Sequence, residues 1–147
     1  MEKASGVYLI NKNIIVCGMQ QATTGLWFHN QEYSKLAYNS DYACIGKSIR
    51  DSLLSSRYGV THPSQEYWET SINPLLTLAG EKSYRSLARK AVLCSIRMNN
   101  EEISLLPTRR GKGGIYSHKV ESTKLLSISA TDEELGQALM EAFKLCE

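Results

Sequence analysis

The chain has 147 residues, of which 42% are hydrophobic and 22% are charged, and its formal net charge is +2. This length suits one domain over residues 1–147, with a core large enough to fold without disulfides or metal ions. The composition excludes collagen-like, low-complexity and disordered proteins. The opening run MEKASGVYLINKNIIVCG is broken at residues 11–13, so it lacks a secretory apolar region and a membrane span. We expect a cytoplasmic protein with no membrane partner.

The four cysteines, at positions 17, 44, 94 and 146, are far apart in the chain and form no C-x-x-C pair. No histidine stands at zinc-ligand spacing from another histidine. We therefore predict reduced thiols that behave as small buried hydrophobes, and neither a metal site nor another cofactor.

Residues 6–90 are predicted to contain a hairpin and three helices. Residues 6–17 form two β-branched runs around residues 11–13, which suits a hairpin with a three-residue turn. Residues 22–44 show no clear period and could supply a further strand or a packed loop. Ile45, Ile49 and Leu53 predict a helix that ends near residue 57, with Gly59 beyond its end. Residues 60–73 are predicted as a loop, and residues 73–80 and 83–90 as short helices.

The C-terminal part is predicted to form strands followed by a helix. Residues 92–98 and 103–105 alternate in polarity on either side of Asn99 and Asn100, which predicts a hairpin. Strands around residues 115–120 and 125–129 would extend it into an antiparallel meander. Residues 131–146 combine a capping box with an amphipathic apolar stripe. The predicted fold class is α+β: an antiparallel sheet, built as a hairpin plus a meander, with helices packed mainly on one face and a C-terminal amphipathic helix.

Two segments share one pattern, IGKSIRDSL over residues 45–53 and LGQALMEAF over residues 135–143, with Gly46 and Gly136 at the same place. A glycine inside a helix costs about 1 kcal/mol relative to alanine. Its presence in both segments therefore suggests close backbone packing, with both helices against the same sheet. The alternative is that two ordinary amphipathic helices look alike by chance.

The stretch TRRGKGG over residues 108–114 combines three cations and three glycines, as a phosphate-binding loop would. It fails the G-x-x-x-x-G-K-[ST] pattern, because Leu106 and Gly113 stand where a glycine and a hydroxyl residue are required. The glycines more simply supply the positive φ angles of a connection between two strands.

RNA binding is the alternative function that the residues suggest. Residues 81–124 hold ten cations against four anions, and residues 131–147 hold five anions against one cation. Arg109, Arg110, Lys112 and Lys119 stand close to Tyr116 in the sequence. A small cytoplasmic RNA-binding protein would use such a cluster, but the aromatic residues expected on a sheet for base stacking are too few.

No catalytic signature is present. The histidines at positions 29, 62 and 118 have no nucleophile elbow around them, and Cys94 lies in an apolar alternation that predicts an inert, buried thiol. The adjacent acids Glu101 and Glu102 stand beside a turn, and residues 132–134 stand in the first turn of a helix, where negative charge is favourable. We predict that the protein is not an enzyme.

Three segments, IGKSIRDSLLSSR, AGEKSYRSL and ELGQALMEAFKLC, together with the glycine-rich connection after Pro107, resemble the CdiI immunity proteins of contact-dependent growth inhibition systems. The resemblance runs from residue 45 to the end of the chain. It implies a cytoplasmic protein with no chemistry of its own, whose partner is the C-terminal toxin domain of a cognate CdiA effector, often a ribonuclease. Direct contact with nucleic acid is not expected, because inhibition would work by masking the active site of the toxin.

A cationic toxin cleft would be covered by carboxylates and an aromatic anchor. The best candidates by residue type are consecutive in the predicted loop after the first helix: Glu66, Tyr67, Trp68 and Glu69. The alternative is that Trp68 fills the core while the two glutamates are only solvated. The acidic face of the last helix is a second candidate surface. Because the net charge is positive, either the acidic surface is local or the toxin is bound away from its active site.

Overall fold

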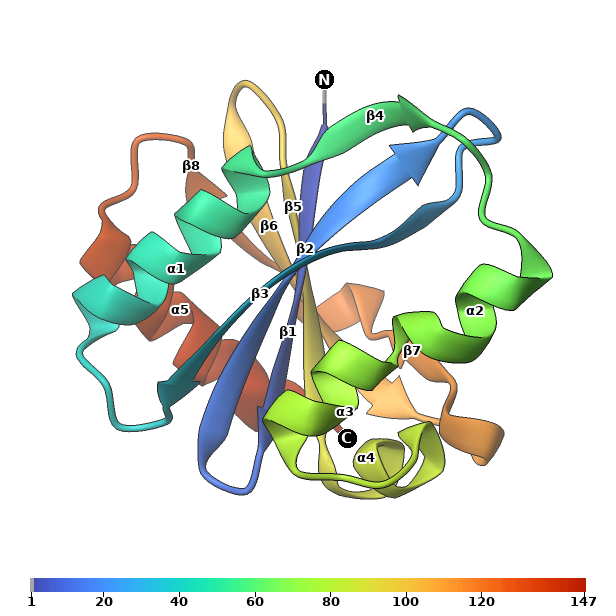
Figure 1. The fold of residues 1–147 in the computed structure, drawn as a ribbon. Helices are drawn as coiled ribbons and strands as arrows, with labels where there is room; N and C mark the ends of the chain where they lie inside the picture. Colours follow the sequence, from blue (N-terminus) through green and yellow to red (C-terminus); the bar gives the residue numbers. More distant parts are fainter. Residues whose placement is uncertain (1) are drawn as a thin grey trace.

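The computed structural model describes residues 2–147, which form a sheet with helices on both faces (Figure 1). The strands are β1 (Lys3–Ile10), β2 (Asn13–Ala22), β3 (Trp27–Ala37), β4 (Arg57–Val60), β5 (Val92–Met98), β6 (Glu102–Arg110), β7 (Tyr116–His118) and β8 (Lys124–Ser127). The helices are α1 (Tyr42–Leu54), α2 (Gln65–Ser71), α3 (Asn73–Ala79), α4 (Tyr84–Lys90) and α5 (Asp132–Leu145), with short 3-10 turns η1 (Lys112–Gly114) and η2 (Val120–Ser122). Within residues 2–147, no helix has the length and apolar character that a membrane crossing requires.

The sheet has the order β3-β2-β1-β5-β6, and β7 and β8 flank the far edge of β6. All neighbouring strands are antiparallel except β4, which runs parallel to β2. The predicted N-terminal hairpin is confirmed, but its turn consists only of Asn11 and Lys12, with φ angles of 49° and 63°. Two positive φ angles give a tight turn whose twist matches that of the strands. The predicted hairpin after residue 92 is confirmed as β5 and β6.

The fourth strand of the predicted meander is placed differently, because β8 pairs with β6 and not with β7. β7 and β8 follow one another along the same edge of β6, so together they form one interrupted neighbour of that strand. Pro107 explains the interruption. Its carbonyl accepts a hydrogen bond from the Lys119 N–H on this edge (2.8 Å), but proline has no N–H to donate in return. The chain therefore leaves the sheet at η2 and rejoins it at β8.

Side chains along β1 and β2 alternate between two cores. Val7, Ile14 and Val16 pack with α1 and α5, whereas Tyr8 and Ile15 pack with α3 and α4. Figure 1 shows the two long helices together on one side of the sheet and the short helices on the other. The predicted α+β fold is confirmed, with its main helical layer on one face and with α3 and α4 covering part of the opposite face.

The backbones of α1 and α5 touch at two glycines. Gly46 faces the carbonyl of Asp132, the first residue of α5, and Gly136 faces the carbonyl of Tyr42, the first residue of α1. A Cβ added at Gly46 would lie 1.8 Å from the Asp132 oxygen, and one added at Gly136 would lie 2.0 Å from the Tyr42 oxygen. The close backbone packing predicted from the repeated pattern is confirmed, and its cause is this reciprocal contact.

The first turn of α5 is fixed from two sides. Thr131 and Glu134 form the predicted capping box, with hydrogen bonds of 3.1 and 3.2 Å between the side chain of each and the N–H of the other. Arg50 of α1 donates hydrogen bonds to the Asp132 carboxylate (2.9 Å) and to the Ala130 carbonyl (2.6 Å). These bonds hold the start of α5 against α1, so that the Asp132 carbonyl lies against Gly46.

Several segments differ from the sequence-based expectations. Residues 22–44, for which a strand and a packed loop were the two alternatives, contain the strand β3 and the start of α1. Residues 60–73, expected to form a loop, contain α2. Ser64 caps α2 by accepting a hydrogen bond from the Tyr67 N–H (3.2 Å). Gly59 does not end α1, because it lies within β4 with a φ angle of 65°. The expected helices after residues 73 and 83 are confirmed as α3 and α4, with Gly80 ending the first and Ser83 capping the second.

Replacing Gly136 with alanine is expected to lower the free energy of unfolding by about 2 kcal/mol or more. Alanine gains about 1 kcal/mol of helix propensity, but its Cβ would overlap the Tyr42 carbonyl and force the two helices apart. Urea denaturation of both proteins measures the difference. Gly6→Ala is the matched control, because a Cβ there meets only Leu93 Cδ1 at 3.8 Å. Equal stability of Gly136→Ala and the unaltered protein would contradict the role of this contact.

Candidate functional site

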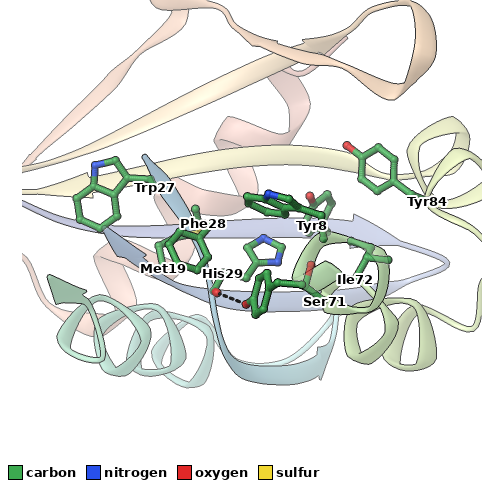
Figure 2. A pocket seen from close by; sticks show the side chains of 10 residues that line it. Tyr8, Met19, Trp27, Phe28, His29, Ser71, Ile72 and Tyr84 are labelled. Carbon is green, nitrogen blue, oxygen red and sulfur yellow. Dashed lines mark hydrogen bonds between the residues drawn. The ribbon is translucent and has the colours of Figure 1, made fainter. Parts of the chain in front are cut away.

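A cavity of about 400 Å³ opens on the side of the sheet that carries the short helices (Figure 2). Its floor comes from β1, β2 and β3, and its walls come from α2 and the beginning of α4. We call it the aromatic pocket. The lining residues are Tyr8, Met19, Trp27, Phe28, His29, Tyr67, Trp68, Ser71, Ile72 and Tyr84.

Three rings form the wall of the aromatic pocket at α2. Phe28, Tyr67 and Trp68 contact one another edge to face, with ring centroids 5.7 to 5.9 Å apart. Pairs with this geometry contribute about 0.5–1.5 kcal/mol each beyond the area they bury. Phe28 is 7% exposed, whereas Trp68 is 40% exposed. Trp68 is therefore the ring of this cluster that a partner can reach most easily.

Hydrogen bonds attach α2 to β3. The Tyr67 hydroxyl donates to the His29 carbonyl (3.4 Å), and the Gln31 amide donates to the Tyr67 hydroxyl (3.3 Å) and to the Ser71 carbonyl (3.2 Å). Gln31 adopts an unusual positive φ of 69°, which a non-glycine residue rarely does. These bonds fix the position of the helix, so the rings on it are held in place before a partner arrives.

The aromatic pocket carries no charge at neutral pH. Burial lowers the pKa of His29 to about 4, so this imidazole is neutral. Burial also raises the pKa of the Tyr8 and Tyr84 hydroxyls above the ordinary value. An uncharged cavity lined mostly by aromatic rings suits an apolar or aromatic side chain.

The structure places the four residues predicted as toxin-binding on α2, and not on a loop. Tyr67 and Trp68 line the aromatic pocket, while Glu66 and Glu69 are exposed. Within residues 2–147, neither glutamate lies within ion-pair distance of a cation. The helix thus presents two free carboxylates close to an aromatic pair.

Sequence reasoning missed the residues of β3 that complete the pocket. Trp27, Phe28 and His29 lie in the segment without a clear period. They are far from α2 in the sequence, and only the folded chain brings them to the same pocket. The consecutive aromatic residues Trp27 and Phe28 were the available signal, because rings of this size usually pack together.

The glycine-rich stretch forms a connection between β6 and β7, as predicted, with φ angles of 73° at Gly113 and 77° at Gly114. Two of the cations in the cluster around it are already paired. Arg109 bonds to Glu121 (3.0 Å) and Glu147 (3.2 Å), and Lys119 lies 3.3 Å from Glu147. The Tyr116 hydroxyl donates to the Ala91 carbonyl (3.0 Å), so this ring is fixed against α4.

The predicted burial of the thiols is confirmed for Cys17 and Cys94 and wrong for Cys44, which is exposed. Cys17 and Cys94 are buried, and burial raises the pKa of both thiols, which disfavours the reactive thiolate. His118 pairs with the Ser95 hydroxyl (3.0 Å) and has no carboxylate partner among the described residues. Over residues 2–147, no group of three or more His, Cys, Asp or Glu is placed to hold a metal ion.

Acidification is expected to destabilise the protein through His29. Its pKa is about 4 in the folded chain, against an ordinary value of 6.5. Between these pH values the unfolded chain binds a proton that the folded chain does not. The contribution of His29 to stability is therefore complete above pH 6.5 and falls by up to about 3 kcal/mol as the pH approaches 4.

Urea denaturation at neutral pH and at about pH 5 tests this expectation. The variant His29→Phe keeps a ring in the pocket and removes the titrating group, so its stability should fall less than that of the unaltered protein. If both proteins lose the same free energy on acidification, His29 is not responsible.

Comparisons with known proteins identify the family to which the chain belongs. The model of the CdiI family, described as CDI immunity protein, matches residues 4–146. A protein of unknown function from Neisseria meningitidis has a TM-score of 0.85 and 18% sequence identity, covering 100% of this chain and 96% of that chain. A chain of the CdiA-CT/CdiI toxin and immunity complex from Yersinia pseudotuberculosis has a TM-score of 0.85 and 18% identity, covering 100% of this chain and 98% of that chain. No curated protein sequence matches this chain.

At 18% identity, the two solved structures share a fold with this chain. The family model covers nearly the whole chain, so the resemblance inferred from residue 45 onward is confirmed and extends to the N-terminal strands. Proteins of this family are immunity proteins, which inhibit toxins and do not catalyse reactions. The chain belongs to the CdiI family of immunity proteins of contact-dependent growth inhibition systems.

Proposed function

We propose that this protein binds the C-terminal toxin domain of a cognate CdiA effector through α2 and the aromatic pocket, and thereby neutralises the toxin. Membership of the CdiI family supports a toxin partner, and the similar Yersinia pseudotuberculosis chain comes from a toxin and immunity complex. The observation that carries the choice of surface is Trp68, which is 40% exposed at the edge of a preformed apolar cavity. Partly exposed Trp and Tyr residues beside a cavity are typical of binding hot spots.

The aromatic pocket suits an anchoring side chain of the toxin. Its rings are fixed by edge-to-face contacts and by the hydrogen bonds of Tyr67. A pocket that is already formed costs little conformational entropy on binding. An apolar toxin residue inserted beside Trp68 would exclude water from both partners, which is the main favourable contribution at such an anchor.

The toxin in this proposal is a ribonuclease, and the bound immunity protein masks its active site in the cytoplasm. Enzymes that cleave RNA bind a polyanion and therefore carry cationic clefts. Glu66 and Glu69 are exposed carboxylates without cationic partners in the described chain, so they are free to face such a cleft. Their position beside Trp68 lets one surface combine an apolar anchor with charge complementarity.

The contacts favour a protein partner over RNA. Arg109 and Lys119, two of the cations suggested for RNA binding, are occupied by Glu121 and Glu147. The Tyr116 ring, which would have to stack on a base, is held by its hydroxyl at the Ala91 carbonyl. RNA would have to break these interactions before it could use Arg109, Lys119 or the Tyr116 ring, which leaves it Arg110 and Lys112 of the suggested cluster.

Coexpression with candidate CdiA C-terminal toxin domains tests the proposal as a whole. The protein is expected to copurify with one such domain and to restore growth of the cells that produce it. If no toxin domain is captured or neutralised, the proposed function is wrong.

Replacing Trp68 with alanine is expected to weaken binding of the captured toxin domain by at least about tenfold, because truncating a hot-spot ring costs about 2 kcal/mol. The melting temperature should fall by only a few degrees, because the variant loses the two edge-to-face contacts with Phe28 and Tyr67 but Trp68 is already 40% exposed. Calorimetric titration and a thermal melt measure the two quantities. Leu54→Ala is the matched control, because Leu54 is an exposed apolar residue on α1. A large drop in melting temperature with unchanged affinity would assign Trp68 to folding instead.

Masking predicts competition between this protein and RNA. A toxin domain made inactive by substitution should release a fluorescent RNA when this protein is added, as measured by anisotropy. The double variant with Glu66→Gln and Glu69→Gln should compete about tenfold less well, because it lacks the complementary charge.

Glu133→Gln on α5 is the control for the second acidic surface, since Glu133 is also exposed. A complex in which toxin, RNA and this protein are all bound would contradict masking. If Glu133→Gln weakens competition more than the double variant on α2 does, the toxin binds at α5 and not at α2.

A further inference from the structure

A second cavity, of about 390 Å³, lies between α4 and the connection from β6 to β7. We call it the arginine pocket. Its lining has guanidinium groups and glycine backbone but no carboxylate: the residues are Arg85, Ala88, Arg89, Arg110, Gly111, Gly113 and Gly114. The function proposed above makes no use of it.

The arginines of this pocket are the ones that the protein leaves unpaired. The chain has seven arginines. Four of them pair with carboxylates: Arg50 with Asp132, Arg57 with Glu32, Arg97 with Glu2, and Arg109 with Glu121 and Glu147. The remaining three, Arg85, Arg89 and Arg110, all line the arginine pocket, and within residues 2–147 none of them lies within 4.0 Å of a carboxylate.

The geometry of strand β6 explains why Arg109 is paired with carboxylates and its neighbour Arg110 is not. Successive side chains of a strand point to opposite faces, so Arg109 reaches Glu121 and Glu147 while Arg110 turns toward α4. There the Arg110 guanidinium donates a hydrogen bond to the Arg89 carbonyl. This bond uses one of its five N–H donors and leaves others free in a fixed orientation.

The opposite wall of the pocket is also held in place. The Tyr84 hydroxyl donates to the Gly114 carbonyl (2.8 Å). Gly114 lies so close to α4 that an added Cβ would be 2.9 Å from the Tyr84 ring and 3.0 Å from Ala88 Cβ, and its φ angle is 77°. The connection is thereby fixed against α4, and all three arginines line the cavity between them.

We propose that the arginine pocket binds carboxylate side chains of the partner protein, and that it forms one continuous docking surface with the aromatic pocket. Charge complementarity carries the choice of ligand, because an unpaired guanidinium is a planar fork of N–H donors that matches a carboxylate in two-point hydrogen bonding. Continuity comes from Tyr84, which lines the aromatic pocket and contacts Gly114 in the arginine pocket. The proposal deepens the proposed function, since the partner is the toxin domain.

A carboxylate of a protein fits this cavity better than the phosphates of RNA. Single-stranded nucleic acid is held by rings on which its bases stack. The two rings nearest to the pocket, Tyr84 and Tyr116, are half-buried and fixed by their hydroxyls at the carbonyls of Gly114 and Ala91. Each ring is tied at its hydroxyl, so it cannot turn freely to stack on a base. The partner is therefore expected to carry an acidic patch next to its apolar anchor.

Titration of the isolated protein with a tetraglutamate peptide, followed by amide NMR, tests the ligand chemistry without a toxin. The amide signals of Gly111, Gly113 and Gly114 should shift and saturate, while those of Gly25 and Gly80 should not. Arg110→Gln and Arg85→Gln should each raise the dissociation constant at least fivefold. Arg109→Gln is the matched control, because it removes the same charge from the adjacent residue, which already pairs with Glu121 and Glu147. Circular dichroism checks that each variant is folded.

Several outcomes would overturn the proposal. Oligouridylate of matched charge that shifts the same glycine amides at least tenfold more tightly than the peptide would make this a nucleic-acid site. Inorganic phosphate that shifts these amides at least tenfold more tightly than the peptide would instead indicate a site for a small anion. Absence of any saturable shift, or equal effects of Arg109→Gln and Arg110→Gln, would show that the pocket has no specific affinity for carboxylates.

The captured toxin domain separates this proposal from the proposed function. If the unaltered protein binds the toxin and Arg85→Gln with Arg110→Gln weakens binding at least tenfold, both proposals are supported. If the toxin binds equally well to the variant, the arginine pocket is not part of the interface although the proposed function stands. If no toxin binds while the peptide still does, the proposed function fails and the carboxylate site remains.

Discussion

The reciprocal contacts of Gly46 with Asp132 and of Gly136 with Tyr42 determine how closely the two long helices pack. Because each glycine lies against the first carbonyl of the other helix, α1 and α5 come close enough to share one face of the sheet. The residues that they bury there completely are Ile45, Ile49, Leu53, Leu135, Leu139 and Ala142. This packing gives the sheet a stable side, so the opposite side can be covered by short helices and still retain two preformed pockets.

The short helices differ in how firmly they are attached. α3 and α4 bury Leu75 and Leu87 completely against β1 and β2, whereas α2 has no buried residue. The aromatic contacts of Tyr67 and the bonds of Gln31 hold α2 instead. Apolar side chains that are not needed to complete a core remain available to a partner. This is the physical reason why the candidate site lies at α2, beside the firmly packed α4.

The parts of the fold that depend on local patterns could be predicted from the sequence. The stripe of α5 and its capping box each specify structure within a few residues, and so do the strands around Asn11 and Asn99. The parts that depend on distant partners could not. The pairing of β8 with β6 follows from the missing N–H of Pro107, whose effect appears only once the neighbour of that strand is known. Likewise Tyr67 and Trp68 were recognisable by residue type, but Phe28, which completes their cluster, lies far away in the sequence.

Unpaired carboxylates and unpaired arginines lie at different places on the surface that carries the short helices. Glu66 and Glu69 lie on α2, and Arg85, Arg89 and Arg110 lie around α4, with the uncharged aromatic pocket adjoining both helices. A net charge of +2 would repel a cationic partner only weakly, and at physiological salt the local arrangement matters more because charges are screened beyond about 8 Å. A partner with a cationic site at one end of its interface and acids at the other would be attracted in one orientation and repelled in the reverse one. The positive net charge is thus compatible with the proposed masking of a cationic cleft, because the acidic and basic groups would act at different ends of the proposed interface.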